Sequence, residues 1–189
     1  MGAVMGAANA FGFVFLQSLH ASSTLFGVSV VVNSAVECLF LFYSDRLLRR
    51  FGSRSLLALS VVSLALRLCG FPLVSLLSAP AALLVFDPLL GVAVAAFWIA
   101  SVHFAHEEAP PGLAATAQAA MASLHGGLGL GVGSLVAGAL YAALGPLALF
   151  AALIAALAVT LGVTRDFLLR ATPTPTPKRR DDSAVDRLV

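Results

Sequence analysis

The chain has 189 residues, of which 60% are hydrophobic and only 11% are charged. Soluble domains are about 25% charged, so this composition excludes a soluble globular protein and indicates an integral membrane protein. The formal net charge of +2 does not indicate a nucleic-acid partner, because the basic residues cluster at the ends of apolar runs. Cys38 and Cys69 lie inside apolar runs, which predicts free, buried thiols rather than a disulfide or a metal site.

The apolar runs predict six membrane-spanning helices, since a helix needs about 20 mostly apolar residues to cross a bilayer. The predicted spans cover residues 1–20, 24–43, 55–77, 80–104, 113–141 and 144–167. We therefore expect an all-α transmembrane domain over residues 1–168. Residues 169–189 carry Thr-Pro repeats followed by a charged cluster, a composition that predicts a disordered cytoplasmic tail.

The basic residues predict how the chain crosses the membrane. Ten of the eleven Lys and Arg residues lie between the second and third spans or near the C-terminus: Arg46, Arg49, Arg50, Arg54, Arg165, Arg170, Lys178, Arg179, Arg180 and Arg187. Short loops rich in Lys and Arg stay on the cytoplasmic side. Both segments are therefore predicted to be cytoplasmic, and with six spans the N-terminus is predicted to be cytoplasmic as well.

The remaining basic residue, Arg67, lies inside the third span, where a charge is costly unless it faces a partner or a cavity. At about 1.5 Å per residue, Arg67 lies about 18 Å from the cytoplasmic side. Asp87, in the fourth span, lies about 20 Å from the same side, so the two are at nearly the same depth. Glu37 in the second span is about 10 Å deep by the same rule. We predict an Arg67–Asp87 ion pair with Glu37 nearby.

These three charges have two interpretations. They can form a proton or substrate relay, in which a buried carboxylate exchanges the arginine for a proton. They can also form a static ion pair that locks the third and fourth spans together. Three charges within adjacent spans exceed what packing requires, which favours the relay for Arg67 and Glu37. For Asp87 both remain open, because a kink at Pro88 can place the carboxylate in the outer vestibule.

Other polar or aromatic residues inside the spans are candidates for lining a substrate cavity. They are Asn9, Gln17, Asn33, Trp98, Gln118 and His125. Each polar side chain can equally hydrogen-bond a neighbouring helix, an interaction worth about 0.6 kcal/mol. The Trp98 ring can stack on a ligand or simply pack. His103, His106, Glu107 and Glu108 resemble metal ligands by type, but their position before Pro110 favours a solvated helix end, and we predict neither a metal site nor a cofactor.

The fifth span is rich in glycine. Its Gly127/Gly131 and Gly129/Gly133 pairs have the four-residue spacing that lets a neighbouring backbone approach closely. Ser134 in this span invites comparison with an intramembrane protease. The last span contains no histidine to act as the base, so no enzyme is predicted.

A faint internal repeat links the two halves of the chain. Gly52 lies between the second and third spans, and Gly145 lies between the fifth and sixth. Each is predicted to form a tight turn, the first cytoplasmic and the second external. Three spans repeated in inverted orientation is an architecture of membrane transporters.

Residues 43–54 resemble the short basic loop of the major facilitator superfamily, in which an acidic residue, basic residues and a glycine join two helices. The similarity extends over residues 1–167. It includes residues 21–27, Glu37, the Leu66-Arg67 pair, residues 87–91 and the Gly-rich fifth span. The pattern resembles the C-terminal six-helix half in the lactose-permease-related, MFS-associated-domain branch. The segment from Asp45 to Gly52 is longer than in the usual family motif. The family also has ionisable His and Glu residues in its fourth helix, and in this sequence only Asp87 lies near those positions.

The resemblance implies transport of a small solute by alternating access, as a proton-coupled symporter. Glu37 and Arg67 then bind substrate and couple protons. The implied gating loop consists of Asp45, Arg46, Arg49, Arg50, Gly52 and Arg54. A sugar, a nucleoside and a drug-like solute all remain open as substrate.

Six helices alone leave the cavity face towards lipid, so a partner half is expected. The abrupt start at the first span favours a missing N-terminal six-helix segment over a second copy of the chain. Two alternatives remain: a homodimeric half-size transporter, and a membrane scaffold or regulatory protein that keeps the fold without transport. A scaffold would tolerate Glu37→Gln and Arg67→Ala.

Overall fold

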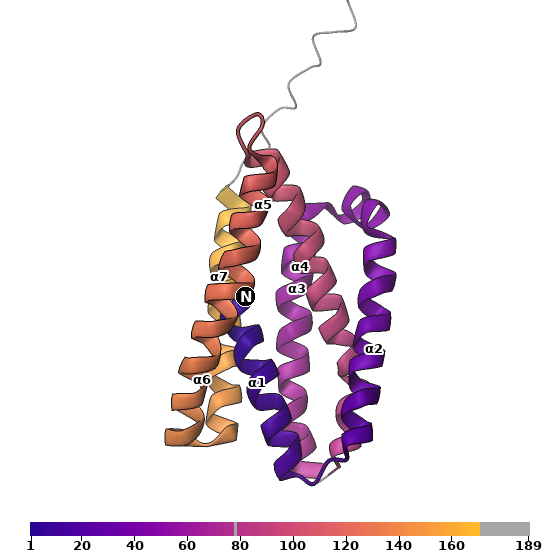
Figure 1. Ribbon diagram of the computed structural model, residues 1–189, viewed down its shortest axis with the longest axis vertical. Coiled ribbons are helices and arrows are strands. Elements are labelled where there is room, and N and C mark those ends of the chain that lie inside the picture. The colour runs from indigo at the N-terminus through magenta and orange to yellow at the C-terminus, as the bar shows by residue number, and fades with distance from the viewer. Residues whose placement is uncertain (78, 171–189) are drawn as a thin grey trace, which may run out of the picture.

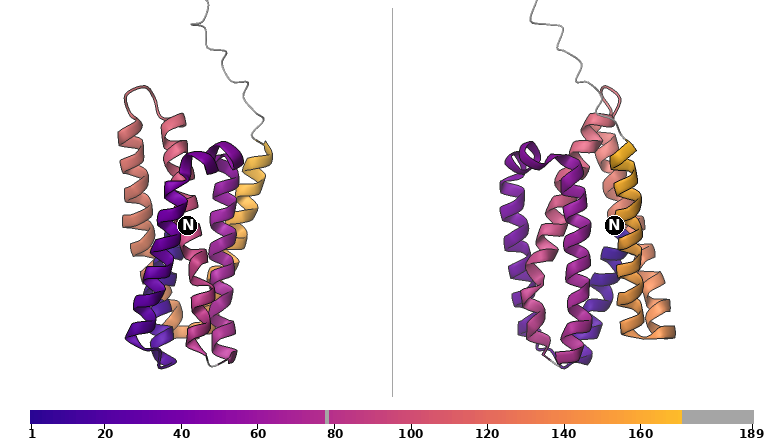
Figure 2. Two further views of the ribbon diagram at one scale, coloured as in Figure 1. Left: turned by 90° about the vertical axis from the view of Figure 1, so that its right-hand side faces the viewer. Right: turned by 180° about the vertical axis from the view of Figure 1, so that it is seen from behind.

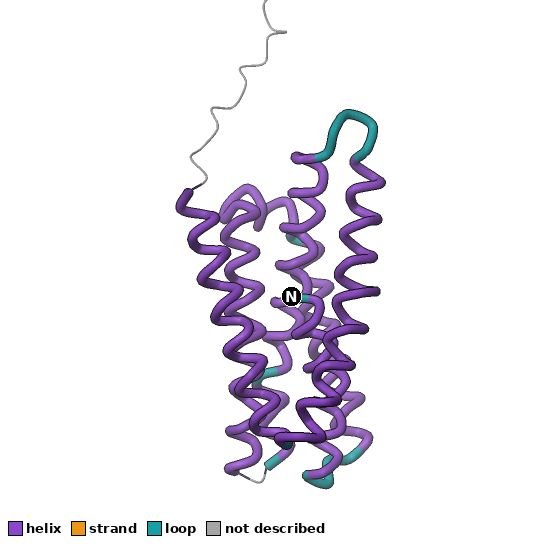
Figure 3. The backbone as a smooth tube through the Cα atoms, turned by 90° about the vertical axis from the view of Figure 1, so that its left-hand side faces the viewer, coloured by secondary structure: helices purple, strands orange, loops and turns teal. Residues whose placement is uncertain are grey.

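The computed structural model describes residues 1–77 and 79–170, with side chains described as far as residue 163. The described residues are almost entirely helical and contain no strand (Figures 1 and 3), which confirms the all-α prediction. The elements in order are α1 (Gly2–Ser18), α2 (Ser23–Phe42), α3 (Ser44–Leu77), η1 (Pro80–Val85), α4 (Asp87–Glu108), α5 (Ala114–Ala122), η2 (Ser123–Gly129), α6 (Leu130–Leu144) and α7 (Pro146–Arg170). The predicted tail, apart from the end of α7, lies outside the described residues.

Five of the six predicted spans are long and apolar enough to cross a membrane. By length and composition they are Ser23–Phe42, Ser44–Leu77, Pro80–Glu108, Ala114–Leu144 and Pro146–Val163. The remaining predicted span is the first along the chain, α1. It is apolar but has 17 residues and is therefore about 25 Å long, less than the roughly 30 Å of a bilayer core. Its N-terminus lies partway along the bundle in Figure 1.

Successive spans run in opposite directions along the bundle, with α5, η2 and α6 together forming one span (Figure 1). The α2–α3 and α4–α5 junctions and the C-terminal end of α7 lie at one end, and the α1–α2 and α6–α7 junctions lie at the other. The two arginine-containing segments, at the start of α3 and the end of α7, therefore share one end of the molecule. This arrangement is the one that the charge pattern predicts.

Two packed groups of helices form the bundle (Figure 2). In one group α4 packs against α2 and α3, and in the other α1 and α7 pack against α6. The α3–α7 contact joins the groups, and its centre is an aromatic cluster. The Phe71 and Phe150 rings stack with centroids 4.3 Å apart, and Phe15 packs edge-on against Phe150 at 5.3 Å. All three rings are buried, so the core continues across both groups.

The two predicted glycine turns are present. Gly52 has φ 74° and ψ 157°, and Gly145 has φ 82° and ψ 177°. These conformations are nearly the same, and side chains with a Cβ rarely adopt them. Gly52 interrupts α3, so the predicted basic loop is a short helix over residues 44–51 followed by the long span from residue 53.

Two spans contain irregular turns that the hydrophobic pattern does not predict. The fourth starts as the 3₁₀-helix η1, and a regular helix begins only at Asp87, with Pro88 in the first turn where its missing N–H is harmless. It continues to Glu108, past the predicted end. The fifth span contains the π-helix η2 among its glycines. Such π-helical turns are frequent at functional sites.

The glycine pairs of the fifth span differ in their surroundings. A Cβ at Gly133 would collide with the backbone of Ala3 in α1, and one at Gly129 would meet the Gly2 backbone at 3.1 Å. This pair therefore forms the predicted close contact. A Cβ at Gly127 or Gly131 would meet nothing within 4 Å in the described part of the chain, so close contact at that pair stays a prediction. The two pairs are offset by two residues, which is more than half a turn of helix, so they lie on different faces and only Gly129/Gly133 faces α1.

This difference supplies a matched pair of variants. Gly133→Ala is expected to lower the thermal stability of the purified protein by about 1–3 kcal/mol, because the added methyl overpacks the α1–α6 contact. Gly131→Ala, two residues away with nothing within 4 Å, should leave stability unchanged or slightly higher. Thermal unfolding in one detergent measures both. Equal melting temperatures for the two variants would contradict the α1–α6 contact.

The cysteine prediction needs a correction. Cys38 and Cys69 are free, as expected, but both side chains are exposed on the surface of the chain instead of being buried in it. An apolar run in a membrane protein can face lipid or a neighbour as readily as its own core, so an apolar sequence context alone does not predict burial in the protein.

Candidate functional site

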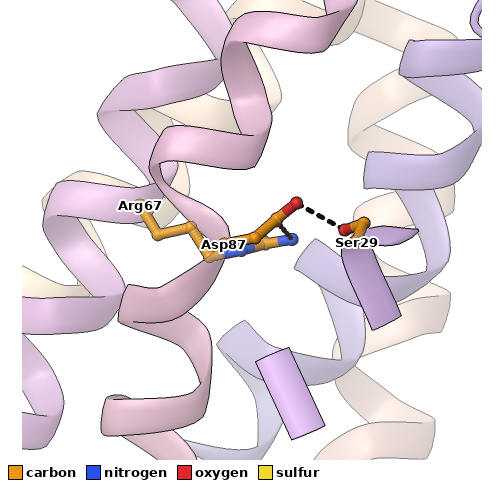
Figure 4. A network of polar contacts seen from close by, with 3 residues as sticks. All are labelled: Ser29, Arg67 and Asp87. Carbon is orange, nitrogen blue, oxygen red and sulfur yellow. Dashed lines mark hydrogen bonds and ion pairs between the residues drawn. The ribbon is translucent and has the colours of Figure 1, made fainter. Parts of the chain in front are cut away.

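The predicted ion pair between Arg67 and Asp87 is present (Figure 4). Nη2 of Arg67 lies 3.2 Å from Oδ1 of Asp87, and both residues are buried, with 7% and 1% of their surface exposed. Arg67 projects from the middle of α3 and Asp87 is the first residue of α4. Because charges lose their hydration on burial, each of these two groups depends on the other for compensation.

Asp87 lies inside the bundle and not in an outer vestibule. The chain changes from the 3₁₀-helix η1 to α4 at Phe86, and this change turns the first residue of α4 towards α2 and α3. The hydroxyl of Ser29 on α2 donates a hydrogen bond of 2.5 Å to Oδ2 of Asp87. One carboxylate therefore joins three helices, as the sticks in Figure 4 show.

Ser29 was not predicted as a site residue, although the sequence contains a signal for it. Ser29, Asn33 and Glu37 are four residues apart along α2, a spacing that places them on one helix face. All three line one cavity together with Arg67. A polar stripe of this kind within an apolar span marks the face that is turned towards a polar interior.

This cavity, called here the Arg67 cavity, has a volume of about 390 Å³. It lies between α1, α2, α3 and α4. Its lining residues are Ala8, Asn9, Gly12, Phe13, Leu16, Phe26, Ser29, Val30, Asn33, Glu37, Arg67, Phe71, Leu90 and Val94. Asn9 and Asn33 are two of the six residues proposed from the sequence to line a cavity, and both line this one. The cavity is large enough for a small organic solute.

Several polar atoms at the Arg67 cavity lack partners. Nε and Nη1 of Arg67 and Oδ1 of Asn33 are buried and form no hydrogen bond in the part of the chain that the structure describes. Leaving such a group unpaired costs about 1–3 kcal/mol. Glu37 lines the cavity with Arg67, as predicted, but the two are not ion-paired in the described residues. The site therefore has unused donors and acceptors.

The other predicted cavity residues lie elsewhere. Trp98 and Gln118 line a second hollow of about 470 Å³, between α4, α5 and the α2–α3 junction. His125, in the π-helix η2, stacks on Phe97 with ring centroids 4.3 Å apart and packs edge-on against Trp98. Gln17 is exposed on α1 and lines neither cavity. The predicted set is therefore divided between the two hollows, with Gln17 at neither.

The histidines at the end of α4 form part of this second hollow. Nε2 of His103 lies 3.1 Å from Oε1 of Glu107, one turn along the same helix. No group of three or more potential ligands within the described ranges is arranged to hold a metal ion. This geometry supports the helix-end interpretation, in which the pair stabilises the last turn of α4.

Ser134 has a local structural partner. Its hydroxyl donates a 2.8 Å hydrogen bond to the carbonyl oxygen of Leu130, one turn earlier in α6. Serine hydroxyls inside membrane helices commonly form this bond with their own backbone. The bond explains how a serine is accommodated in this apolar helix.

A bundle of long apolar helices around a buried ion pair and a solute-sized cavity defines a multi-pass membrane protein of the transporter type. Comparison with known families identifies it further. The model of the MFS_1 like family matches residues 1–152, and the chain belongs to this family, which is related to the major facilitator superfamily. Its members are generally transporters rather than enzymes. No solved structure matches the chain.

Proposed function

We propose that this chain forms one half of a secondary transporter, which moves a small solute by alternating access and couples the movement to protons. The observation that carries the proposal is the Ser29–Asp87–Arg67 network beside the Arg67 cavity. An ionisable group inside a membrane domain is costly and marks a substrate or proton pathway. Substrate sites of such transporters lie near the middle of the bilayer, where we place this cavity.

The proposed coupling uses the exchange of partners by Arg67. With Asp87 ionised, the carboxylate holds Arg67 and, through Ser29, holds α2 against α4. Protonation of Asp87 removes the charge that retains the guanidinium. Arg67 is then free to turn towards the cavity, where Glu37 or a solute supplies the acceptors that its Nε and Nη1 lack. A ligand or proton that favours one arrangement shifts the population towards it.

An inverted repeat is part of the proposal. Gly52, near the start of α3, and Gly145, between α6 and α7, share nearly the same backbone conformation. The start of α3 and the α6–α7 junction lie at opposite ends of the bundle (Figure 1). They occupy equivalent positions if the first three spans and the last three are two copies in inverted orientation. This correspondence supports the transporter architecture in which two repeats rock around a central site. As part of the same proposal, we place the arginine-rich end of the bundle and both termini on the cytoplasmic side, because short loops rich in Lys and Arg stay on that side.

A second set of six helices completes the proposed transporter. Neither α2 nor α5 contains a buried residue, and α2 exposes large apolar side chains such as Val31 and Leu39. We propose that the partner covers this side of both cavities, either as another segment of the same polypeptide or as a second copy.

The identity of the partner has a direct measurement. The protein is solubilised from its native membrane in a mild detergent, and its mass is measured with and without denaturation. An antibody against residues 173–189 that detects a denatured band well above 19.4 kDa would identify a longer polypeptide. A 19.4 kDa band that migrates as a dimer before denaturation would identify two copies. A 19.4 kDa band that stays monomeric would contradict a two-half transporter.

Transport itself is tested in proteoliposomes with an imposed inward proton gradient. Uptake is measured for a panel of sugars, nucleosides and drug-like solutes, with and without a protonophore. Glu37→Gln is expected to reduce uptake at least tenfold without lowering thermal stability, because Glu37 has no ion-pair partner in the described residues. A protein that transports no panel member would favour a scaffold that only retains the fold. A Glu37→Gln variant with full uptake would show that the Glu37 carboxylate is not needed for transport.

A further inference from the structure

The short helix over residues 44–51 rests on a rigid base at the arginine-rich end of the bundle. Leu47 and Leu48 pack against a buried cluster that Leu56 of α3 forms with Ala96, Ile99 and Ala100 of α4. Gly52 then turns the chain sharply into the long part of α3. The arginines on the other side therefore belong to a helix that packs on the bundle instead of to a loose loop.

Three of these arginines form no ion pair in the described part of the chain. They are Arg46, Arg49 and Arg50, and all three are exposed. Two lie against aromatic rings instead. The guanidinium carbon of Arg46 is 5.7 Å from the Tyr43 ring centroid, and that of Arg50 is 5.6 Å from the Phe51 centroid. Such contacts orient the arginines and leave their donors available.

Aromatic rings surround the charges and are themselves exposed. The exposed fractions are 80% for Phe42, 44% for Tyr43 and 51% for Phe51. A hollow of about 210 Å³ lies among Phe42, Tyr43, Asp45, Arg46 and Arg49. Tyr and Trp side chains concentrate at the headgroup level of membranes, where the polar end of the ring meets water and the apolar part meets acyl chains. Two arginines against one aspartate leave the hollow positively charged.

We propose that this surface, called here the arginine–aromatic surface, binds the phosphate of an anionic phospholipid from the surrounding leaflet. The planar guanidinium donors match phosphate oxygens in pairs, and clustered basic residues directly at the end of a membrane helix attract anionic lipids. The exposed Phe42 and Phe51 rings provide contacts for the glycerol and the upper acyl chain. A lipid fits this surface better than a soluble anion, because a soluble anion would leave those rings uncovered.

The test compares lipids retained by the purified full chain. The protein is reconstituted in equal parts of phosphatidylcholine and phosphatidylglycerol and extracted gently, and bound lipids are counted by native mass spectrometry. We expect phosphatidylglycerol to be enriched over phosphatidylcholine. The Arg46→Gln/Arg49→Gln/Arg50→Gln variant should lose that enrichment by at least about tenfold, since each basic residue near an anionic membrane contributes about fivefold.

Two further variants keep the test decisive. Arg165→Gln/Arg170→Gln/Lys178→Gln removes the same number of charges from the other basic segment and should retain the enrichment. Arg46→Lys/Arg49→Lys/Arg50→Lys keeps the charge without the planar donors and should retain more lipid than the glutamine variant. Helicity by circular dichroism checks that each variant folds. No enrichment in the native chain, or equal loss in both glutamine variants, would overturn the proposal.

Discussion

Asp87→Asn is expected to abolish proton-driven uptake and to destabilise the bundle in the same variant. The asparagine keeps the size of the side chain and still accepts a hydrogen bond from Ser29, but it leaves Arg67 charged, buried and unpaired. Removing one partner of a buried ion pair costs about 3–5 kcal/mol. Thermal unfolding in detergent measures this loss, and uptake under an imposed proton gradient should fall to the background of empty liposomes.

Two companion variants separate the charge from the hydrogen bond. Ser29→Ala removes only the hydroxyl, and hydrogen bonds between membrane helices contribute about 0.6 kcal/mol on average. Most of the stability and uptake should remain. Asp87→Asn/Arg67→Gln removes both charges and should regain most of the stability, because no unpaired charge is left, while uptake stays absent. If this double variant transports like the native protein, the pair is a static lock between α3 and α4.

The Arg67–Asp87 pair could be predicted because depth in a membrane follows from sequence position. A spanning helix must satisfy its own backbone hydrogen bonds in lipid, so long apolar runs are helices and each residue adds about 1.5 Å of depth. Two opposite charges at one depth on consecutive spans then have few other partners. Depth does not give the direction of a side chain around the helix axis. Glu37, at about 10 Å against about 18 Å for Arg67, lies at another depth, and the two are not ion-paired in the described residues.

What the sequence did not predict depends on contacts between helices. Gly129/Gly133 and Gly127/Gly131 have identical spacing, and only the position of α1 decides which pair is in contact. The same applies to Trp98, which lies with Gln118 at the second hollow, because the rotation of α4 turns it away from Arg67. The irregular turns η1 and η2 were not predicted, since apolar composition is the same for 3₁₀-, α- and π-helices.

Gly91→Ala is the second variant with a large expected effect. Gly91 lies one turn after Asp87 on α4, where a Cβ would collide with the Asn33 carbonyl oxygen of α2 and approach the backbone nitrogen of Glu37 to 3.0 Å. Backbone atoms cannot move aside as a flexible side chain does, so the methyl group must push α2 away from α4. Ser29 is then expected to lose its hydrogen bond to Asp87, and the polar stripe of α2 is expected to shift relative to Arg67.

Overpacking of this kind costs about 1–3 kcal/mol, which should appear as a lower melting temperature. We expect uptake to fall more than stability does, by at least tenfold, because small displacements of positioned groups strongly affect function. Gly27→Ala is the matched control: it adds the same methyl to α2 at a position with nothing within 4 Å. The control should transport normally. Normal uptake by Gly91→Ala as well would show that the close α2–α4 contact is not needed for transport.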